Sequence, residues 1–152
     1  MTTTPFQTAP SLPDYQPPAN VYASVVRHGS IAYVSGHIAK TPAEVSFTGK
    51  AGADISLDDA RRSAELATLN ALASLSHALD GLQQLDRIVK LTVFVASAPG
   101  FNEQPKVADA ASALLQTMFG EKGTAARSAI GVAELPRNAS VEVEMIVALR
   151  ES

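Results

Sequence analysis

Charged side chains begin two apolar runs near the C-terminus, and these charges could do chemistry. Arg127 precedes the run SAIGV, while Glu142 and Glu144 alternate with apolar residues in VEVEMIVAL. A guanidinium is planar and always charged, so it can bind a carboxylate through two parallel hydrogen bonds. A nearby Glu can orient or activate a water molecule. The structural alternative is a cross-strand salt bridge, or two separately solvated edge charges, because surface ion pairs are common.

Other motifs for catalysis or binding are missing from the sequence. His28, His37 and His77 lack the spacing of metal ligands, and the chain has no cysteine, so we expect no metal site. Glycine-rich phosphate loops and the GxSxG elbow are also absent. The net charge of −3 argues against a nucleic acid or an anionic membrane as the partner.

The charges must be positioned by a sheet. Five segments are rich in β-branched and aromatic residues, which favour strands. They are 21–28, 31–38, 87–96, 126–133 and 140–149, and the first two meet at a hairpin turn at His28-Gly29. Segment 40–55 contains turn residues and predicts a loop.

Two segments predict helices. Between Ser56 and Gly81, small and apolar residues recur at steps of three and four, which gives one apolar face. Ser56 can cap this helix and Gly81 can end it. The second helix runs from Pro105, which is tolerated in a first turn, to Phe119, with Gly120 after it.

The order ββαβαββ predicts an α+β fold, with two helices packed on one face of a mixed sheet. In the last strand Val141, Val143, Met145, Val147 and Leu149 point one way. Glu142, Glu144, Ile146 and Ala148 point the other way. A sheet face that is partly apolar predicts an oligomer that covers it.

The first 20 residues hold five of the nine prolines and predict an extended segment, either loose or laid across the surface. We therefore divide the chain into an N-terminal extension, 1–20, and one domain, 21–152. The start has neither a basic nor an apolar signal region, and no apolar run reaches the length of a membrane helix. These features favour a cytoplasmic protein without a membrane partner.

The segment ARSAIGVAELPRNASVEVE, residues 126–144, resembles the Rid family (reactive intermediate deaminases, YjgF-like) in its ARS, LP and VEVE elements and their spacing. Tyr22 precedes Ser35-Gly36 at the family interval, and TVFVA is similar to the family's central strand. The resemblance extends from about Val21 to Leu149.

The resemblance implies a chorismate mutase-like fold and a homotrimer, in which three sheets form a closed barrel and the sites lie in clefts between subunits. It implies a 2-iminobutanoate/2-iminopropanoate deaminase, which hydrolyses 2-imino acids to 2-keto acids and ammonia without a cofactor. Arg127 would bind the substrate carboxylate and Glu142 would orient the attacking water. Tyr22 and Gly36 would line the cleft, and the backbone at Ser128 and Ala129 would contact the substrate.

Two positions depart from the family pattern. The archetypal deaminases have Cys where this chain has Ala129, and Asn where it has Ala108. These departures indicate a different branch and leave two alternatives open. One is a small-carboxylate-binding or regulatory trimer without this activity. The other is a hydrolase or deaminase of a different imine or amide. Ribonuclease activity, also ascribed to the family, is disfavoured by the acidic balance of charge.

Overall fold

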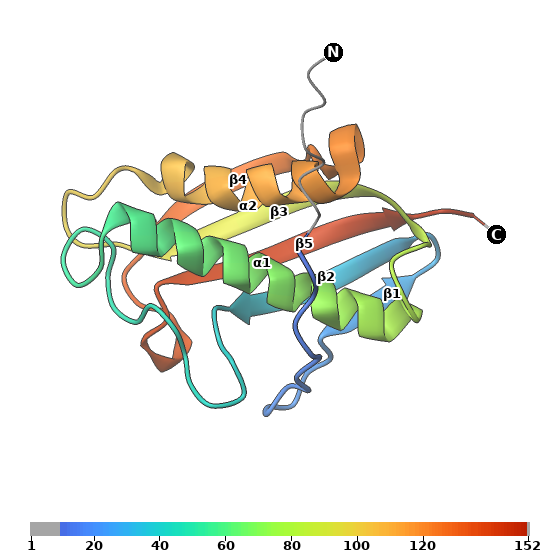
Figure 1. Cartoon of the computed structure of the whole chain (residues 1–152), viewed down its shortest axis with the longest axis horizontal. Coiled ribbons are helices and arrows are strands. Elements are labelled where there is room, and N and C mark those ends of the chain that lie inside the picture. Colours follow the sequence, from blue (N-terminus) through green and yellow to red (C-terminus); the bar gives the residue numbers. More distant parts are fainter. Residues whose placement is uncertain (1–9, 152) are drawn as a thin grey trace, which may run out of the picture.

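The computed structural model describes residues 10–151. The order of the main elements is the predicted ββαβαββ, and a short 3-10 turn precedes each of the last two strands (Figure 1). The strands are β1 (Val25–His28), β2 (Ile31–Ile38), β3 (Leu85–Ala96), β4 (Ala126–Val132) and β5 (Val141–Leu149). The helices are α1 (Leu57–Leu79) and α2 (Gln104–Phe119), and the 3-10 turns are η1 (Gly120–Gly123) and η2 (Pro136–Asn138).

The five strands form one mixed sheet in the order β1-β2-β5-β3-β4. The pair β3–β4 is parallel, and all other neighbours are antiparallel. A parallel pair needs a crossover connection, which α2 supplies. The predicted mixed sheet is confirmed, and β4, which carries Arg127, is one of its two edges.

The start of α1 follows the predicted capping chemistry. The Ser56 side chain accepts a hydrogen bond from the Asp59 backbone N–H at 3.1 Å. At the other end Asp80, not Gly81, is the cap, in the left-handed region at φ 54°. Aspartate tolerates this conformation, and Gly81 follows with φ 111°. The helix therefore ends one residue earlier than the glycine alone suggested.

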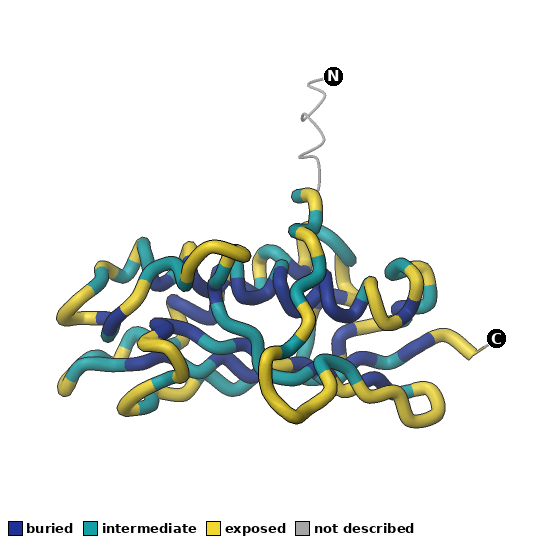
Figure 2. The backbone as a smooth tube through the Cα atoms, turned by 90° about the horizontal axis from the view of Figure 1, so that it is seen from below, coloured by how far each residue is buried: buried dark blue, intermediate teal, exposed yellow. Residues whose placement is uncertain are grey.

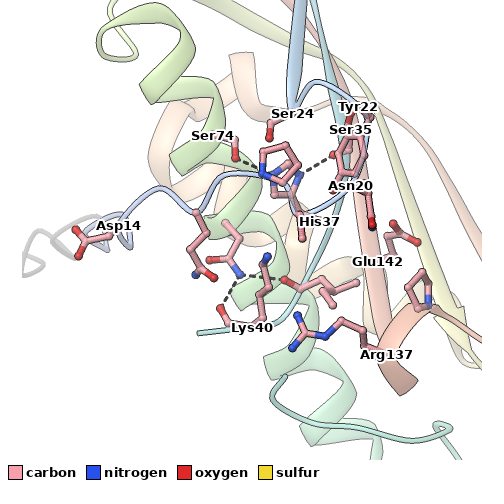
Figure 3. Close-up of a pocket in the computed structure, with 17 residues that line it drawn as sticks. Asp14, Asn20, Tyr22, Ser24, Ser35, His37, Lys40, Ser74, Arg137 and Glu142 are labelled. Carbon is pink, nitrogen blue, oxygen red and sulfur yellow. Dashed lines mark hydrogen bonds between the residues drawn. The ribbon is translucent and has the colours of Figure 1, made fainter. Parts of the chain in front are cut away.

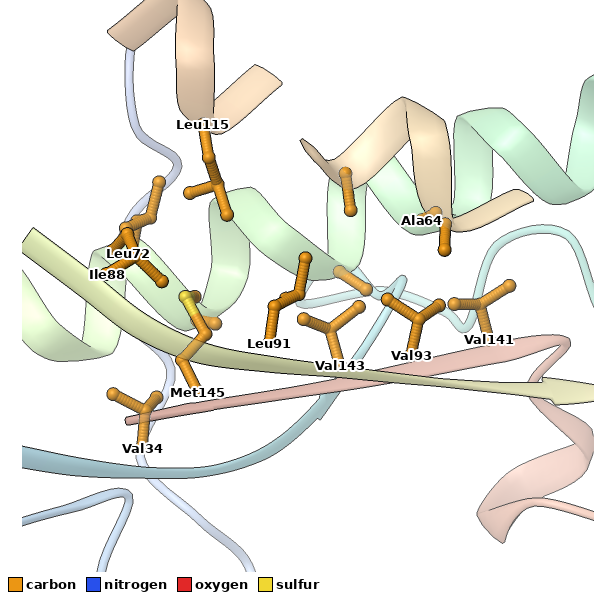
Figure 4. Packing of buried hydrophobic residues seen from close by; sticks show 14 of the residues in the cluster. Val34, Ala64, Leu72, Ile88, Leu91, Val93, Leu115, Val141, Val143 and Met145 are labelled. Carbon is orange, nitrogen blue, oxygen red and sulfur yellow. The ribbon is translucent and has the colours of Figure 1, made fainter. Parts of the chain in front are cut away.

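The core lies between the sheet and a single layer made by both helices (Figures 1 and 2). The inward residues of β5 are fully or nearly fully buried, as predicted: Val141, Val143, Met145, Val147 and Leu149. They pack with side chains such as Leu72, Ile88 and Leu115 (Figure 4). Small residues on α1, including Ala60, Ala64 and Ala67, are wholly buried, so the helix lies close to the sheet. Each large side chain contributes about 1.5–3 kcal/mol by leaving water.

Within residues 10–151, no layer covers the opposite face of the sheet. Val26, Tyr33 and Ile146 lie side by side across β1, β2 and β5 in the strand register. Val26 is 53% exposed and Tyr33 is 50% exposed. Together with Lys90 and Thr92 they line a shallow hollow. We call this the open sheet face.

Residues 10–20 of the N-terminal extension lie across α1 without regular structure (Figure 1). Leu12 packs against the core, and the Tyr15 ring stacks on His77 with ring centroids 3.9 Å apart. Of the two predicted alternatives, this part of the chain therefore takes the one laid across the surface.

Candidate functional site

A cavity of about 350 Å³ lies where β2 ends and β5 begins (Figure 3). Its walls come from these strands, from α1, from η2 and from the N-terminal extension. Tyr22, Gly36 and Glu142, three of the residues predicted for the site, line it together. Gly36 and Glu142, which are far apart in the chain, meet here because β2 and β5 are hydrogen-bonded neighbours.

The floor of the cavity depends on a bulge in β2. The register between β2 and β5 shifts between Val34 and His37, which takes Ser35 and Gly36 out of the regular pairing. Such bulges re-aim side chains, and they are frequent next to active sites. The Glu142 carboxylate packs over Gly36, where any Cβ would collide with it. Gly36 therefore leaves room for the Glu142 carboxylate in this position, and a side chain at residue 36 would displace it.

Glu142 is a half-buried carboxylate that forms no salt bridge with any residue between 10 and 151. Burial raises the pKa of its carboxyl above the ordinary value of 4.5, and the charge of Glu144 raises it further. An unpaired acid with a raised pKa in a cavity is typical of general acid–base sites.

His37 is a cavity residue to which the sequence assigned no role. Its Nδ1 lies 2.6 Å from the Ser35 carbonyl oxygen, and its Nε2 lies 2.7 Å from Ser74 Oγ. A carbonyl only accepts, so Nδ1 carries the proton and Nε2 accepts from the Ser74 hydroxyl. Burial lowers the pKa of His37, and the charge of Lys40 lowers it further, against the effect of the Ser35 hydrogen bond. The ring is therefore neutral at pH 7 and fixed in one orientation.

Asn70, one turn before Ser74 on α1, holds the chain where it leaves β2. Its amide nitrogen donates to the carbonyl oxygens of Ile38 at 2.9 Å and Lys40 at 3.0 Å. Its own oxygen, Oδ1, is buried without a hydrogen-bond partner. The helix thus anchors the strand end from which the Lys40 side chain reaches the cavity.

Arg127 does not line this cavity. Its Nη1 donates to Asp109 Oδ1 at 2.7 Å and to Ser112 Oγ at 3.2 Å, both on α2. The alternative of a cross-strand salt bridge between Arg127 and Glu142 is therefore wrong. Only Nη1 is engaged by residues 10–151, so one edge of the guanidinium remains for a further acceptor.

Arg127 and Glu142 face opposite sides of the sheet. Arg127 pairs with Leu91 and points toward α2, whereas Glu142 pairs with Phe94 and lies on the other side. β3 separates their strands, which therefore lie about 10 Å apart. The two residues are also offset along the strands, because their partners on β3 are Leu91 and Phe94. One chain alone does not bring these two side chains together.

The two residues that follow Arg127 also lie away from the cavity. Ser128 is on the open sheet face, where its hydroxyl accepts from Lys90 Nζ at 3.0 Å. Ala129 is half-buried against the core on the helix side. The predicted site residues therefore divide into two sets, one at the cavity and one on β4.

The described part of the chain holds neither a metal-binding cluster nor a membrane-spanning helix. Between residues 10 and 151 no group of three His, Cys, Asp or Glu side chains could hold a metal ion. Within the same range, no helix is long and apolar enough to cross a membrane.

The fold and the cavity place this chain among α+β proteins with the chorismate mutase-like arrangement of two helices over a mixed sheet. The family model described as Endoribonuclease L-PSP matches residues 14–149. The chain belongs to this family, the one that its ARS, LP and VEVE segments resemble.

Three relatives support the assignment. Protein TCP17 of Trypanosoma cruzi is 40% identical over 139 residues, which cover 91% of this chain and 87% of that protein. The 2-iminobutanoate/2-iminopropanoate deaminase of Dermatophagoides farinae is 30% identical over 133 residues, 87% of this chain and 88% of that protein. The crystal structure of Atu1372 from Agrobacterium tumefaciens superposes with a TM-score of 0.86 at 41% identity, covering 92% and 86% of the two chains.

Proposed function

We propose that this protein hydrolyses reactive 2-imino acids, such as 2-iminopropanoate and 2-iminobutanoate, to 2-keto acids and ammonia. The observation that carries the proposal is Glu142, an unpaired carboxylate with a raised pKa that faces a cavity beside Tyr22 and Gly36. The 30% identity to a deaminase of this specificity supports it.

The proposal requires a homotrimer with its sites between subunits. The open sheet face carries exposed apolar side chains, which favour burial against other copies. Arg127 and Glu142 lie on opposite sides of one sheet, so a shared site needs Arg127 from one subunit and Glu142 from its neighbour. A closed ring of three copies would provide three such clefts.

In such a cleft each side chain has a defined role. Arg127, with the Ser128 and Ala129 backbone beside it, binds the substrate carboxylate through its free edge. Glu142 accepts a proton from a water molecule while the oxygen adds to the imine carbon. That proton passes to the imine nitrogen and gives a carbinolamine. The carbinolamine collapses when its hydroxyl proton moves, through Glu142, to the amino nitrogen, so the C–N bond breaks, ammonia leaves and the C=O bond forms. The Tyr22 ring and hydroxyl line the substrate's position. These steps need no metal or cofactor.

Arg127→Ala tests the function. The substrates are freshly generated 2-iminopropanoate and 2-iminobutanoate, with loss of imine and release of ammonia as readouts. We expect kcat/KM to fall at least about 100-fold, since a charge-assisted bidentate contact is lost, while the protein remains trimeric.

Arg150→Ala is the matched control, because Arg150 is exposed beyond the end of β5. It should behave like the wild-type protein. A trimeric wild-type protein that fails to accelerate the loss of either imine would contradict the deaminase proposal. It would favour the alternatives, a carboxylate-binding trimer or a hydrolase of another imine or amide.

A further inference from the structure

Two cations line the cavity without an acidic partner. Lys40 and Arg137 both contribute to its wall, and neither forms a salt bridge with any residue between 10 and 151. The cavity also contains two carboxylates, Asp14 and Glu142. Asp14 lies at the opposite end of the drawn residues from Arg137, and Glu142 is the proposed base (Figure 3). The two cations are therefore available to a ligand.

The fold holds Lys40 in place. Its carbonyl oxygen accepts a hydrogen bond from the Asn70 amide, and its backbone pairs with Val45 across the following loop. The charge of Lys40 also contributes to the lowered pKa of His37. Because the backbone is anchored on both sides, the Lys40 side chain starts from a fixed position at the end of β2, where it lines the cavity.

The backbone at Arg137 is strained. Arg137 and Asn138 both adopt the left-handed conformation, with φ of 58° and 59°. The Asn138 carbonyl oxygen accepts from the Gly49 N–H at 2.9 Å, and Ala139 pairs with Thr48. Non-glycine residues in this conformation cost free energy, and they persist where the surroundings impose it, often at ligand sites. Here the strained turn carries the Arg137 side chain to the cavity.

Resting on the proposed function, we infer that the preferred substrates are 2-imino acids with a second carboxylate, which Lys40 and Arg137 bind. Arg127 of the neighbouring subunit takes the first carboxylate, next to the imine carbon. The second, at the far end of the substrate, lies between the two unpaired cations.

The size of the cavity agrees with this assignment. A volume of about 350 Å³ lies within the range of pockets that hold larger ligands than a three-carbon imino acid. A substrate with a small apolar side chain would make no contact with the two cations, one of which the strained turn carries to the cavity. A dicarboxylate would neutralise them through charge-assisted hydrogen bonds.

Binding of product analogues tests the inference independently of turnover. Calorimetry would compare 2-oxoglutarate with 2-oxobutanoate on the wild-type trimer. We expect 2-oxoglutarate to bind about tenfold more tightly, the gain typical of a charge-assisted contact. Lys40→Met and Arg137→Gln should each remove most of this preference. Arg137→Lys keeps the charge and should retain part of it, which separates loss of the contact from loss of folding.

The same variants are then assayed on freshly generated 2-iminoglutarate and 2-iminobutanoate, and the ratio of the two kcat/KM values is the readout. Lys122→Met and Arg150→Gln are the controls, because both residues are exposed, and the ratio should not change in them. Turnover of 2-iminobutanoate with no preference for the dicarboxylate would refute the inference and leave the proposed function standing. If the protein hydrolysed none of the imines, the proposed function would be refuted. Equal binding of the two keto acids would refute the inference whether or not imines are hydrolysed.

Discussion

Glu142 illustrates how one residue can lower stability and serve function. Its carboxylate is half-buried, lies over Gly36 and has no salt-bridge partner within residues 10–151. An ionised group in this environment loses hydration without gaining an ion pair. We infer that the proposed general base is retained at a cost to the stability of the fold.

The pH dependence of the stability of a Glu142→Gln variant tests this inference. The folded-state pKa of Glu142 is raised above 4.5, so the folded state binds more protons than the unfolded state between 4.5 and the raised value. This carboxyl therefore destabilises the fold as pH rises through that window. The Gln variant should have a higher Tm than the wild-type protein at pH 7, with the difference shrinking toward pH 4.

The same variant should lose imine hydrolysis by about 100-fold or more, the usual contribution of a general base. Wild-type kcat/KM should fall as pH decreases through the raised pKa of Glu142. A Gln variant that is less stable than the wild-type protein at pH 7, or that keeps full activity, would argue against the assignment. Glu65→Gln, exposed on α1 and away from the cavity, is the matched control.

At the scale of elements, the close approach of α1 to the sheet determines where Asn70 and Ser74 reach the cavity. Small side chains such as Ala60, Ala64 and Ala67 lie fully buried along this contact. Since Asn70 holds the end of β2 and Ser74 orients His37, a displaced helix would disturb the cavity wall directly.

Ala67→Leu should displace the helix. Adding three carbons to a packed site costs about 1–3 kcal/mol in the free energy of unfolding. Ala78→Leu on the exposed side of the same helix should cost less than about 0.5 kcal/mol. Urea denaturation measures both. Equal effects of the two substitutions would show that the alanine stripe does not determine the spacing between helix and sheet.

At the scale of the whole molecule, the open sheet face and the divided site lead to the same proposal. Two of its side chains, Val26 and Tyr33, are about half exposed, although both lie within strands. The proposed site needs Arg127 from one chain and Glu142 from another, so it can form only in an assembly. Assembly and activity should therefore be lost together.

Tyr33→Asp tests the proposed assembly. A charge in a largely apolar interface is costly to remove from water, so we expect the proposed trimer to dissociate to monomers at micromolar concentration. Light scattering coupled to size exclusion measures the mass. Thr117→Asp, exposed on α2, should leave the mass unchanged. If the Tyr33→Asp protein were trimeric, the open sheet face would not form the interface between subunits.

The order of the elements could be predicted from the sequence because their signals are local. The alternation in VEVEMIVAL separates the buried valines from Glu142 and Glu144, and the burial pattern of β5 agrees. Ser56 and the spacing of small residues marked α1 in the same way. The family followed from the ARS, LP and VEVE segments, which require only chain order and spacing.

The sequence by itself thus determined the fold class, the two faces of the last strand and the family. Only the tertiary structure decided which side chains meet, because contacts between distant segments depend on strand order and register. It separated Arg127 from Glu142 within one chain and paired Arg127 with Asp109. It also brought His37, Lys40 and Arg137 to one cavity, although the sequence assigned none of them a role in the site. Their common position results from the β2 bulge, the Asn70 hydrogen bonds and the left-handed turn at Arg137.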